Sequence, residues 1–217
     1  MISSPVVDAL DRPVCSFVLQ LLPAVALGRL LFPPYVTSDN PGLPMNESLS
    51  ILNWNVCSLN CLDCRATIHE TIASTSCNLI CLQETKLATV GPFMATFLGG
   101  QRLKNYVERP ADGTRGGILL AWQEELMSFS HPTIGVHFIN ALVSPEKVAQ
   151  LGITGVYAPQ DEAAKITFLS DLHDMHATCN GPWLLSGDFN MIVSPEEKNN
   201  DNLHRASMRR FRHFIAD

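Results

Sequence analysis

Short apolar runs recur along the chain from Ser48 onward, and polar or turn-forming residues separate them. Runs of this length that alternate, or that are rich in β-branched and aromatic residues, are typical of β-strands. We therefore predict strands within residues 48–56, 78–86, 115–123, 133–143, 151–159 and 182–192. The turn sequence "SPEK" separates the fourth run from the fifth, so we expect these two strands to pair as antiparallel neighbours.

Three other segments have the periodicity of amphipathic helices. Within residues 64–75 the apolar face contains Ile68 and Ile72. In the two longer segments the apolar faces are Phe168, Leu169, Leu172 and Met175 within residues 161–178, and Met208, Phe211 and Ile215 within residues 202–217. Hairpin strands mixed with helices predict an α+β layered fold.

The beginning of the chain has a different pattern. Residues 14–31 are strongly apolar but contain Gln20, Pro23 and Arg29, so their uncharged core is shorter than the roughly 20 residues of a membrane span. We expect one or two short helices packed on the domain, or loosely ordered chain. A signal or anchor, and an extension unrelated to the main domain, are the alternatives.

A proline-rich stretch follows at residues 32–44, "FPPYVTSDNPGLP", and it has the composition of a linker. We therefore divide the chain into an apolar extension with this linker, residues 1–45, and a main domain, residues 46–217. We do not expect a membrane partner.

Composition narrows the class of protein further. The chain has 217 residues, of which 46% are hydrophobic and 17% charged, so it can form one domain with a sizeable core. Its formal net charge of −6 gives no general argument for a nucleic-acid partner, and such a contact needs a local basic patch. Seven cysteines without the spacing of a secreted disulfide scaffold indicate reduced thiols in a reducing compartment.

Polar side chains stand where several predicted strands end, namely Asn55, Glu84, Tyr157, and Asp188 with Asn190. Each of them alone is typical of a turn or a strand end. Dehydrating Asp or Asn is costly, however, so a folded chain gives such groups a partner. If the strand ends lie at one edge of the packed sheets, these side chains converge, and Mg²⁺ prefers carboxylate oxygens.

The motifs "NWNV", "CLQETK", "TGVYAP" and "LLSGDFN" occur in this order. They resemble those of the endonuclease/exonuclease/phosphatase superfamily, and especially the apurinic-type endonuclease domains of plant LINE-like non-LTR retrotransposons. The resemblance covers residues 48–217. It implies a four-layered α/β sandwich and Mg²⁺-dependent (or Mn²⁺-dependent) cleavage of phosphodiester bonds, with the phosphate backbone of DNA as the partner and a nuclear location. We infer no obligate protein partner.

The resemblance also implies a role for each polar strand end. Glu84 corresponds to the metal-binding glutamate, and Asn55 beside it binds the metal or orients the glutamate. Asp188 corresponds to the aspartate that orients and deprotonates the attacking water. Asn190 corresponds to the amide that hydrogen-bonds this aspartate and the phosphate, and Tyr157 to the phenol that donates to a phosphate oxygen. A metal beside these groups stabilises the negative charge of the transition state.

Arg115, which precedes Gly116 and Gly117, is a further candidate for contact with phosphate. A solvated loop arginine is an equal alternative.

The late half of the family's site is an Asp-containing strand followed by a Ser-Asp-His motif, and the sequence ends at Asp217 before either. We expect a C-terminally truncated domain without its last strands, with weak or no nuclease activity. Cys57 also stands where the apurinic enzymes often have an acidic residue.

A rival interpretation comes from the spacing Cys57-x₃-Cys61-x₂-Cys64, which coincides with the [4Fe–4S] pattern of radical S-adenosylmethionine enzymes. Asp63 stands where an aromatic residue is usual in that pattern, and the later motifs belong to the other family.

Two more alternatives stay open. The first is a non-catalytic nucleic-acid-binding module that uses a local basic face, made of Lys198, Arg205, Arg209, Arg210 and Arg212. The second is another phosphoesterase of the same superfamily, acting on a phosphoinositide, sphingomyelin or a nucleotide.

Overall fold

The computed structural model describes residues 17–20, 25–31, 48–145, 150–179, 181–197 and 203–216. Within these ranges the chain forms two five-stranded sheets. The first sheet has the order β2-β3-β4-β6-β5, with β2 (Val25–Leu31), β3 (Ser48–Asn55), β4 (Leu79–Gln83), β6 (Ile118–Trp122) and β5 (Asn105–Arg109). The second has the order β1-β10-β9-β8-β7, with β1 (Phe17–Gln20), β10 (Trp183–Asp188), β9 (Leu151–Tyr157), β8 (Phe138–Pro145) and β7 (Met127–Ile134).

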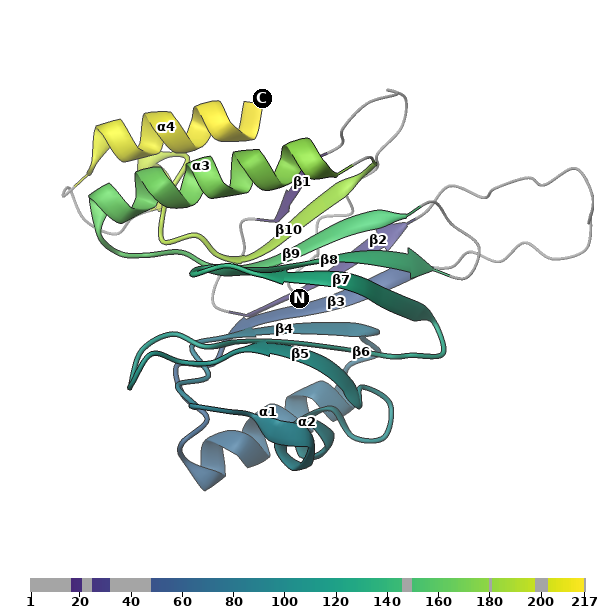
Figure 1. The fold of residues 1–217 in the computed structure, drawn as a ribbon. Helices are drawn as coiled ribbons and strands as arrows, with labels where there is room; N and C mark the ends of the chain where they lie inside the picture. Colours follow the sequence, from purple (N-terminus) through teal and green to yellow (C-terminus); the bar gives the residue numbers. More distant parts are fainter. Residues whose placement is uncertain are drawn as a thin grey trace, which may run out of the picture.

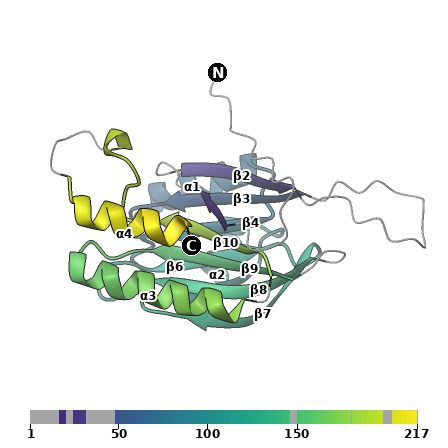
Figure 2. The same cartoon turned by 90° about the horizontal axis from the view of Figure 1, so that it is seen from above.

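The two sheets face each other, and helices cover their outer faces (Figure 1). The first sheet is covered by α1 (Leu62–Ser74) and α2 (Gly91–Gly99). The second is covered by α3 (Glu162–Thr178) and α4 (Arg205–Ala216), which lie next to each other when the molecule is seen from above (Figure 2). This order of layers confirms the predicted four-layered α/β sandwich.

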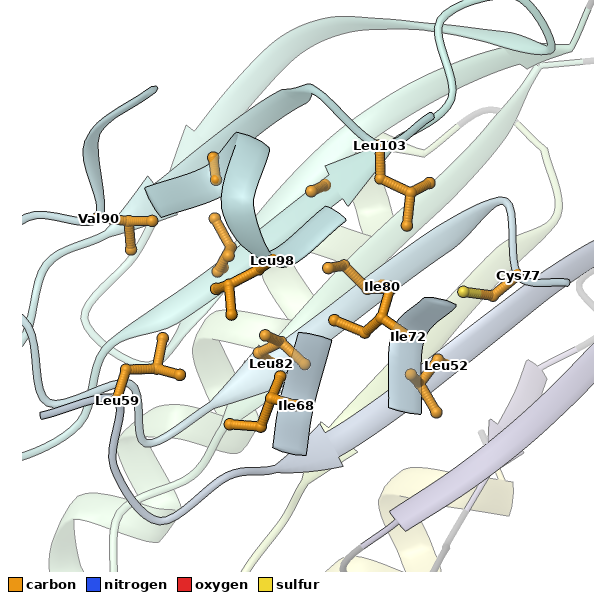
Figure 3. Close-up of a cluster of buried hydrophobic side chains, with 13 residues drawn as sticks. Leu52, Leu59, Ile68, Ile72, Cys77, Ile80, Leu82, Val90, Leu98 and Leu103 are labelled. Atoms are coloured by element: carbon orange, nitrogen blue, oxygen red, sulfur yellow. The ribbon is translucent and has the colours of Figure 1, made fainter. Parts of the chain in front are cut away.

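The alternating pattern of the strands explains how they fill three layers of core. In β3, Leu49 and Ile51 point between the sheets, whereas Leu52 points toward the helices. Figure 3 shows the cluster on the helix side, where Leu52 lies with Ile68 and Ile72 of α1. Full burial of such a side chain stabilises the fold by about 1.5–3 kcal/mol, so the sheets and helices hold each other in register.

Most predicted elements are present. Five of the predicted strand ranges contain a strand, whereas the range 133–143 spans the end of β7 and most of β8. β8 and β9 pair antiparallel as expected, and the three predicted helices correspond to α1, α3 and α4. Within the main domain, α2, β5 and most of β7 were not predicted. Every residue of β5 is only half-buried, and β7 has a bulge and an exposed second half, so neither has the alternation that reveals a strand.

The expectation of short helices within residues 14–31 is wrong where the structure describes them. Residues 17–20 form β1, which pairs parallel with β10, and residues 25–31 form β2, which pairs antiparallel with β3. Both are edge strands, and unpaired ladder groups at the edges of β3 and β10 offer a ready partner for extended chain. The boundary predicted at residue 45 remains a prediction, and the linker at residues 32–44 lies outside the described residues.

The predicted apolar face of α4 is also slightly rotated. Phe211 is buried as expected, but the other buried positions are Ser207 and Phe214, while Met208 and Ile215 are half-buried. Positions 207, 211 and 214 recur at helical spacing, and Phe211 and Phe214 pack in the cluster formed with α3 and the segment after β10.

Among the described helices, none is both long enough and apolar enough to cross a bilayer.

Candidate active site

The carboxyl-terminal ends of four strands meet at one edge of the sandwich. β3 runs parallel to β4, and Asn55 is the register partner of Gln83, the residue before Glu84. In the other sheet β9 runs parallel to β10, and Tyr157 is the register partner of Asp188. Parallel neighbours end at the same edge of their own sheet, and the hydrogen bond from Asn55 to Asp188 shows that these edges of the two sheets meet.

A tight turn fixes Glu84 after β4. Glu84 and Lys86 have positive φ angles of 55° and 53°. The amide of Thr85 donates to the Gly117 carbonyl at 3.3 Å, and that of Lys86 to the Gly116 carbonyl at 2.9 Å. Gly117 has a φ of 90°, and a Cβ there would lie 2.1 Å from Oγ1 of Thr85. Only glycine at position 117 lets the segment that leads into β6 approach Thr85 this closely. Residues in sparsely populated backbone conformations, such as Glu84 and Lys86, cluster at functional sites.

The other carboxylate is fixed at the end of β10. Gly187 has a φ of 148°, and a Cβ there would lie 2.0 Å from the Val156 carbonyl oxygen. The amide of Ala158 donates to the Asp188 carbonyl at 2.8 Å. Phe189 is buried against Phe168 and Phe211, so the residue after Asp188 anchors the turn in the core.

One amide joins the two carboxylates. Nδ2 of Asn55 donates to Oε1 of Glu84 at 3.0 Å and to Oδ2 of Asp188 at 2.9 Å. Oδ1 of Asn55 accepts the amide of Cys57 at 3.1 Å, which keeps the nitrogen turned toward the carboxylates. Two carboxylates from different sheets are therefore held face to face. In this arrangement Asn55 orients both carboxylates, and its own oxygen is turned toward the backbone of Cys57 and away from them.

Glu84 interacts with two further side chains. The Tyr157 hydroxyl donates to Oε1 at 2.9 Å, and Nζ of Lys86 lies 3.1 Å from Oε2. Burial alone would raise the pKa of Glu84, but the hydrogen bonds from Asn55, Tyr157 and Lys86, with the charge of Lys86, outweigh it and leave the pKa below its ordinary value. Burial, followed by the bond to Glu84, raises the pKa of Tyr157, so the phenol keeps its proton.

Asn190 belongs to the same cluster, but its contacts differ from the expected ones. Its backbone amide donates to Oδ1 of Asp188 at 2.9 Å, whereas its side-chain amide donates to the Ala158 carbonyl at 2.7 Å. Asn190 also has a positive φ of 48°. Its side chain thus ties together the segments after β9 and β10, and its backbone orients Asp188.

A cleft of ≈ 740 Å³ opens beside Glu84 and Tyr157. Arg115, the predicted phosphate contact, is exposed on the wall of this cleft, and its role remains a prediction. The same cleft contains three basic residues to which the sequence assigned no role: Lys86, Arg109 and His137. The sequence could have indicated Lys86, because it lies two positions after Glu84 in the same motif. It gave no signal for Arg109, which ends the strand β5 that was not predicted.

The donor set fits a hard divalent cation. In the described part of the chain no group of three His, Cys, Asp or Glu side chains could hold a metal. Mg²⁺ does not need such a cage, because it keeps several waters and is commonly held by one or two carboxylates. Glu84 and Asp188 meet that requirement, and Lys86 shows that the Glu84 carboxylate attracts a cation.

The alternative iron–sulfur site is not supported by the geometry. Cys57 and Cys61 are exposed and Cys64 is half-buried. Among the described residues these thiols do not form a metal-binding group.

Comparisons with known proteins agree with this fold. Residues 52–213 match the sequence profile of the Endonuclease/Exonuclease/phosphatase family. No curated protein matches the sequence.

Two solved structures illustrate the likeness in fold. The AP endonuclease LMAP from Leishmania major superimposes with a TM-score of 0.62 at 15% identity, over 86% of this chain and 71% of that one. ANGEL2, a 2′,3′-cyclic phosphatase crystallised with adenosine-2′,3′-vanadate, superimposes with a TM-score of 0.52 at 13% identity, over 66% of this chain and 54% of that one.

Proposed function

We propose that this chain, which belongs to the endonuclease/exonuclease/phosphatase family, hydrolyses phosphodiester bonds of DNA with Mg²⁺ as its cofactor and Mn²⁺ as the alternative. The main support is the single amide of Asn55, which holds the carboxylates of Glu84 and Asp188 face to face. Such a pair, fixed at the edge of two sheets, provides both a cation site and a base.

Asp188 is the group best placed to act on an attacking water. Both of its oxygens accept hydrogen bonds from fixed donors, Oδ2 from Asn55 and Oδ1 from the backbone of Asn190. A carboxylate held in this way aligns a water for attack on phosphorus and accepts its proton.

Glu84 is the group that would hold the metal. Bound Mg²⁺ would offset the negative charge that grows on the phosphoryl oxygens in the transition state. Tyr157 keeps its proton and can donate to a phosphate oxygen when the substrate replaces Glu84 as its partner. Lys86, 3.1 Å from Glu84, adds positive charge at the same place.

We propose that hydrolysis is slow. Among the described residues no hydrogen bond or ion pair links a histidine to Asp188 or Glu84. His137 lines the neighbouring cleft, but burial, together with the charge of Arg109, lowers its pKa. The lowered pKa favours the neutral imidazole, which contributes no charge toward a phosphate.

DNA is our preferred substrate because of the resemblance of the four motifs to LINE-like endonuclease domains. We propose that the chain derives from such an element. A reverse-transcriptase reading frame directly downstream in the genome would support this origin, and its absence in related loci would count against it.

Another phosphoesterase activity is the second candidate. ANGEL2 shares the fold and is a 2′,3′-cyclic phosphatase, so a nucleotide phosphate is a substrate that the same metal and water chemistry could serve.

A binding module without cleavage is the third candidate. Arg205, Arg209, Arg210 and Arg212 are all exposed on α4, and a cluster of arginines can neutralise phosphates on a chain whose net charge is negative.

The test is nicking of supercoiled plasmid with and without Mg²⁺, using Glu84→Gln, Asp188→Asn and the control Glu70→Gln, an exposed carboxylate on α1. We expect slow, Mg²⁺-dependent nicking by the parent chain and the control, and a loss of about 10²-fold or more in the two site variants. Nicking that survives both site variants would contradict the proposed site. Salt-sensitive binding without cleavage would favour the binding module.

A further inference from the structure

The cleft beside the candidate active site has a basic wall that the chemistry at Glu84 and Asp188 does not use. Arg109 ends β5 and is half-buried in this wall, and Arg115 is exposed on it. Lys86 also lines the cleft but is paired with Glu84. Arg109 is therefore a half-buried cation of this wall that forms no ion pair with a carboxylate among the described residues.

The guanidinium of Arg109 lies next to Gly116, which is also next to Tyr157. A Cβ on Gly116 would lie 3.4 Å from Nη1 of Arg109 and 3.9 Å from two carbons of the Tyr157 ring. The guanidinium and the phenol thus lie close to each other over the bare backbone of one glycine. The Gly116 carbonyl also accepts the amide of Lys86 at 2.9 Å, which ties this part of the wall to the Glu84 turn.

Arg109 has donors to spare. A guanidinium carries five N–H donors, and the hydrogen bond found here is from Nη1 to the neighbouring Pro110 carbonyl at 3.0 Å. In the described ranges no carboxylate lies within ion-pair distance of it. Burial lowers the pKa of Arg109 and Asp112 partly opposes this effect. A half-buried cation of this kind is stabilised when an anion enters the cleft and pairs with it.

We propose that Arg109 binds a phosphate next to the one that is cleaved, so that the site takes a polynucleotide strand in preference to a substrate with one phosphate. This inference rests on the proposed function. A phosphate at Tyr157 is the scissile one, and its neighbour in the strand then lies across Gly116, where the planar guanidinium can donate two parallel hydrogen bonds to it. A chain with a net charge of −6 needs such a local cation to retain a polyanion.

The experiment compares Arg109→Gln with Lys104→Gln. Lys104 is exposed and precedes β5, so the control removes the same charge at the opposite end of the same strand. Binding of a labelled single-stranded oligonucleotide is measured by fluorescence anisotropy without added divalent metal. Hydrolysis of bis(p-nitrophenyl) phosphate, which has a single phosphate, is measured with Mg²⁺. Thermal unfolding of all three proteins checks that the variants fold.

We expect Arg109→Gln to weaken oligonucleotide binding about 10- to 100-fold, the usual loss for a hydrogen bond to a charged group. The slope of log Kd against log salt should fall by about 0.7, as for one phosphate contact on a single strand. Hydrolysis of bis(p-nitrophenyl) phosphate should not change, and Lys104→Gln should resemble the parent chain in both assays.

Three results would overturn the inference, and they differ in what else they affect. Equal oligonucleotide binding by Arg109→Gln and Lys104→Gln removes the subsite but leaves the proposed function intact. A loss of bis(p-nitrophenyl) phosphate hydrolysis in a folded Arg109→Gln variant places Arg109 at the scissile phosphate. A parent chain that neither binds the oligonucleotide nor hydrolyses the small substrate removes the proposed function, and the inference with it.

Discussion

Glu84 and Asp188 end strands of different sheets and face the same amide, but they are held in different ways. Glu84 accepts its hydrogen bonds from the side chains of Asn55, Tyr157 and Lys86. Asp188 shares Asn55 with it but is otherwise held by the backbone of its own turn. Side-chain donors can exchange for a metal or a phosphate, whereas a backbone donor stays in place. In the proposed reaction Glu84 would therefore change partners, whereas Asp188 would keep its orientation.

The largest expected effect is a loss of stability when the backbone of the Asp188 turn is changed. Gly187→Ala would bring a Cβ to 2.0 Å from the Val156 carbonyl oxygen, which belongs to the neighbouring strand and cannot rotate away. We expect the free energy of unfolding to fall by about 3 kcal/mol or more, as measured by urea unfolding.

Gly113→Ala is the matched control for Gly187→Ala, because Gly113 also has a positive φ, 58°, but has open space where the Cβ would be. Gly113→Ala should lower the free energy of unfolding by about 1 kcal/mol, because only the backbone conformation is strained. Equal losses in the two variants would show that the close approach at Gly187 does not hold the turn.

The second effect concerns the amide that both carboxylates share. Asn55→Leu keeps the size of the side chain but removes the donor, so two half-buried carboxylates face each other without it. We expect a loss of about 1–3 kcal/mol in the free energy of unfolding at pH 7. The loss should shrink in Asn55→Leu combined with Glu84→Gln, which removes the repulsion. If the double variant is no more stable than the single one, the two carboxylates do not interact through this residue.

The third effect separates the two carboxylates by their response to metal. Mg²⁺ at about ten times its Kd should stabilise the parent chain by about 1.4 kcal/mol, and EDTA should reverse this. Glu84→Gln should abolish the stabilisation, whereas Asp188→Asn should retain most of it. The reverse pattern, measured by thermal unfolding at several Mg²⁺ concentrations, would exchange the roles assigned to the two residues.

The smallest effect is on the pH dependence of stability. The folded-state pKa of Glu84 lies below its ordinary value of 4.5, so its ionised form stabilises the fold above that pH, and the contribution is lost as the pH falls through the folded pKa. Lys86→Met should reduce this loss by less than about 1 kcal/mol, because the pair is partly exposed to solvent. Urea unfolding at pH 7 and at steps below pH 4.5 measures the difference. A larger acid sensitivity in Lys86→Met would contradict the assignment.

The sequence predicted the strands whose residues face two buried layers, because burial on both sides requires long apolar runs. It also predicted which side chains meet, since Asn55, Glu84, Tyr157 and Asp188 follow such runs. It did not reveal β5 and Arg109, because that strand is half-buried throughout and has no period to detect. Nor could it reveal that Asn190 points to Ala158, because this contact depends on how two separate turns are placed.

The strands β1 and β2 have a mechanical consequence. β1 pairs with β10 in one sheet and β2 pairs with β3 in the other, although only a few residues separate β1 from β2 along the chain. Two consecutive strands therefore belong to different sheets, and they connect the sheets along the side where β10 contacts β3 and β4. A short connection also joins the sheets on the opposite side, where β6 of the first sheet is followed after four residues by β7 of the second, and Trp122 stacks on Phe129 at 4.0 Å. Separating the two sheets therefore strains a short connection on each side of the sandwich.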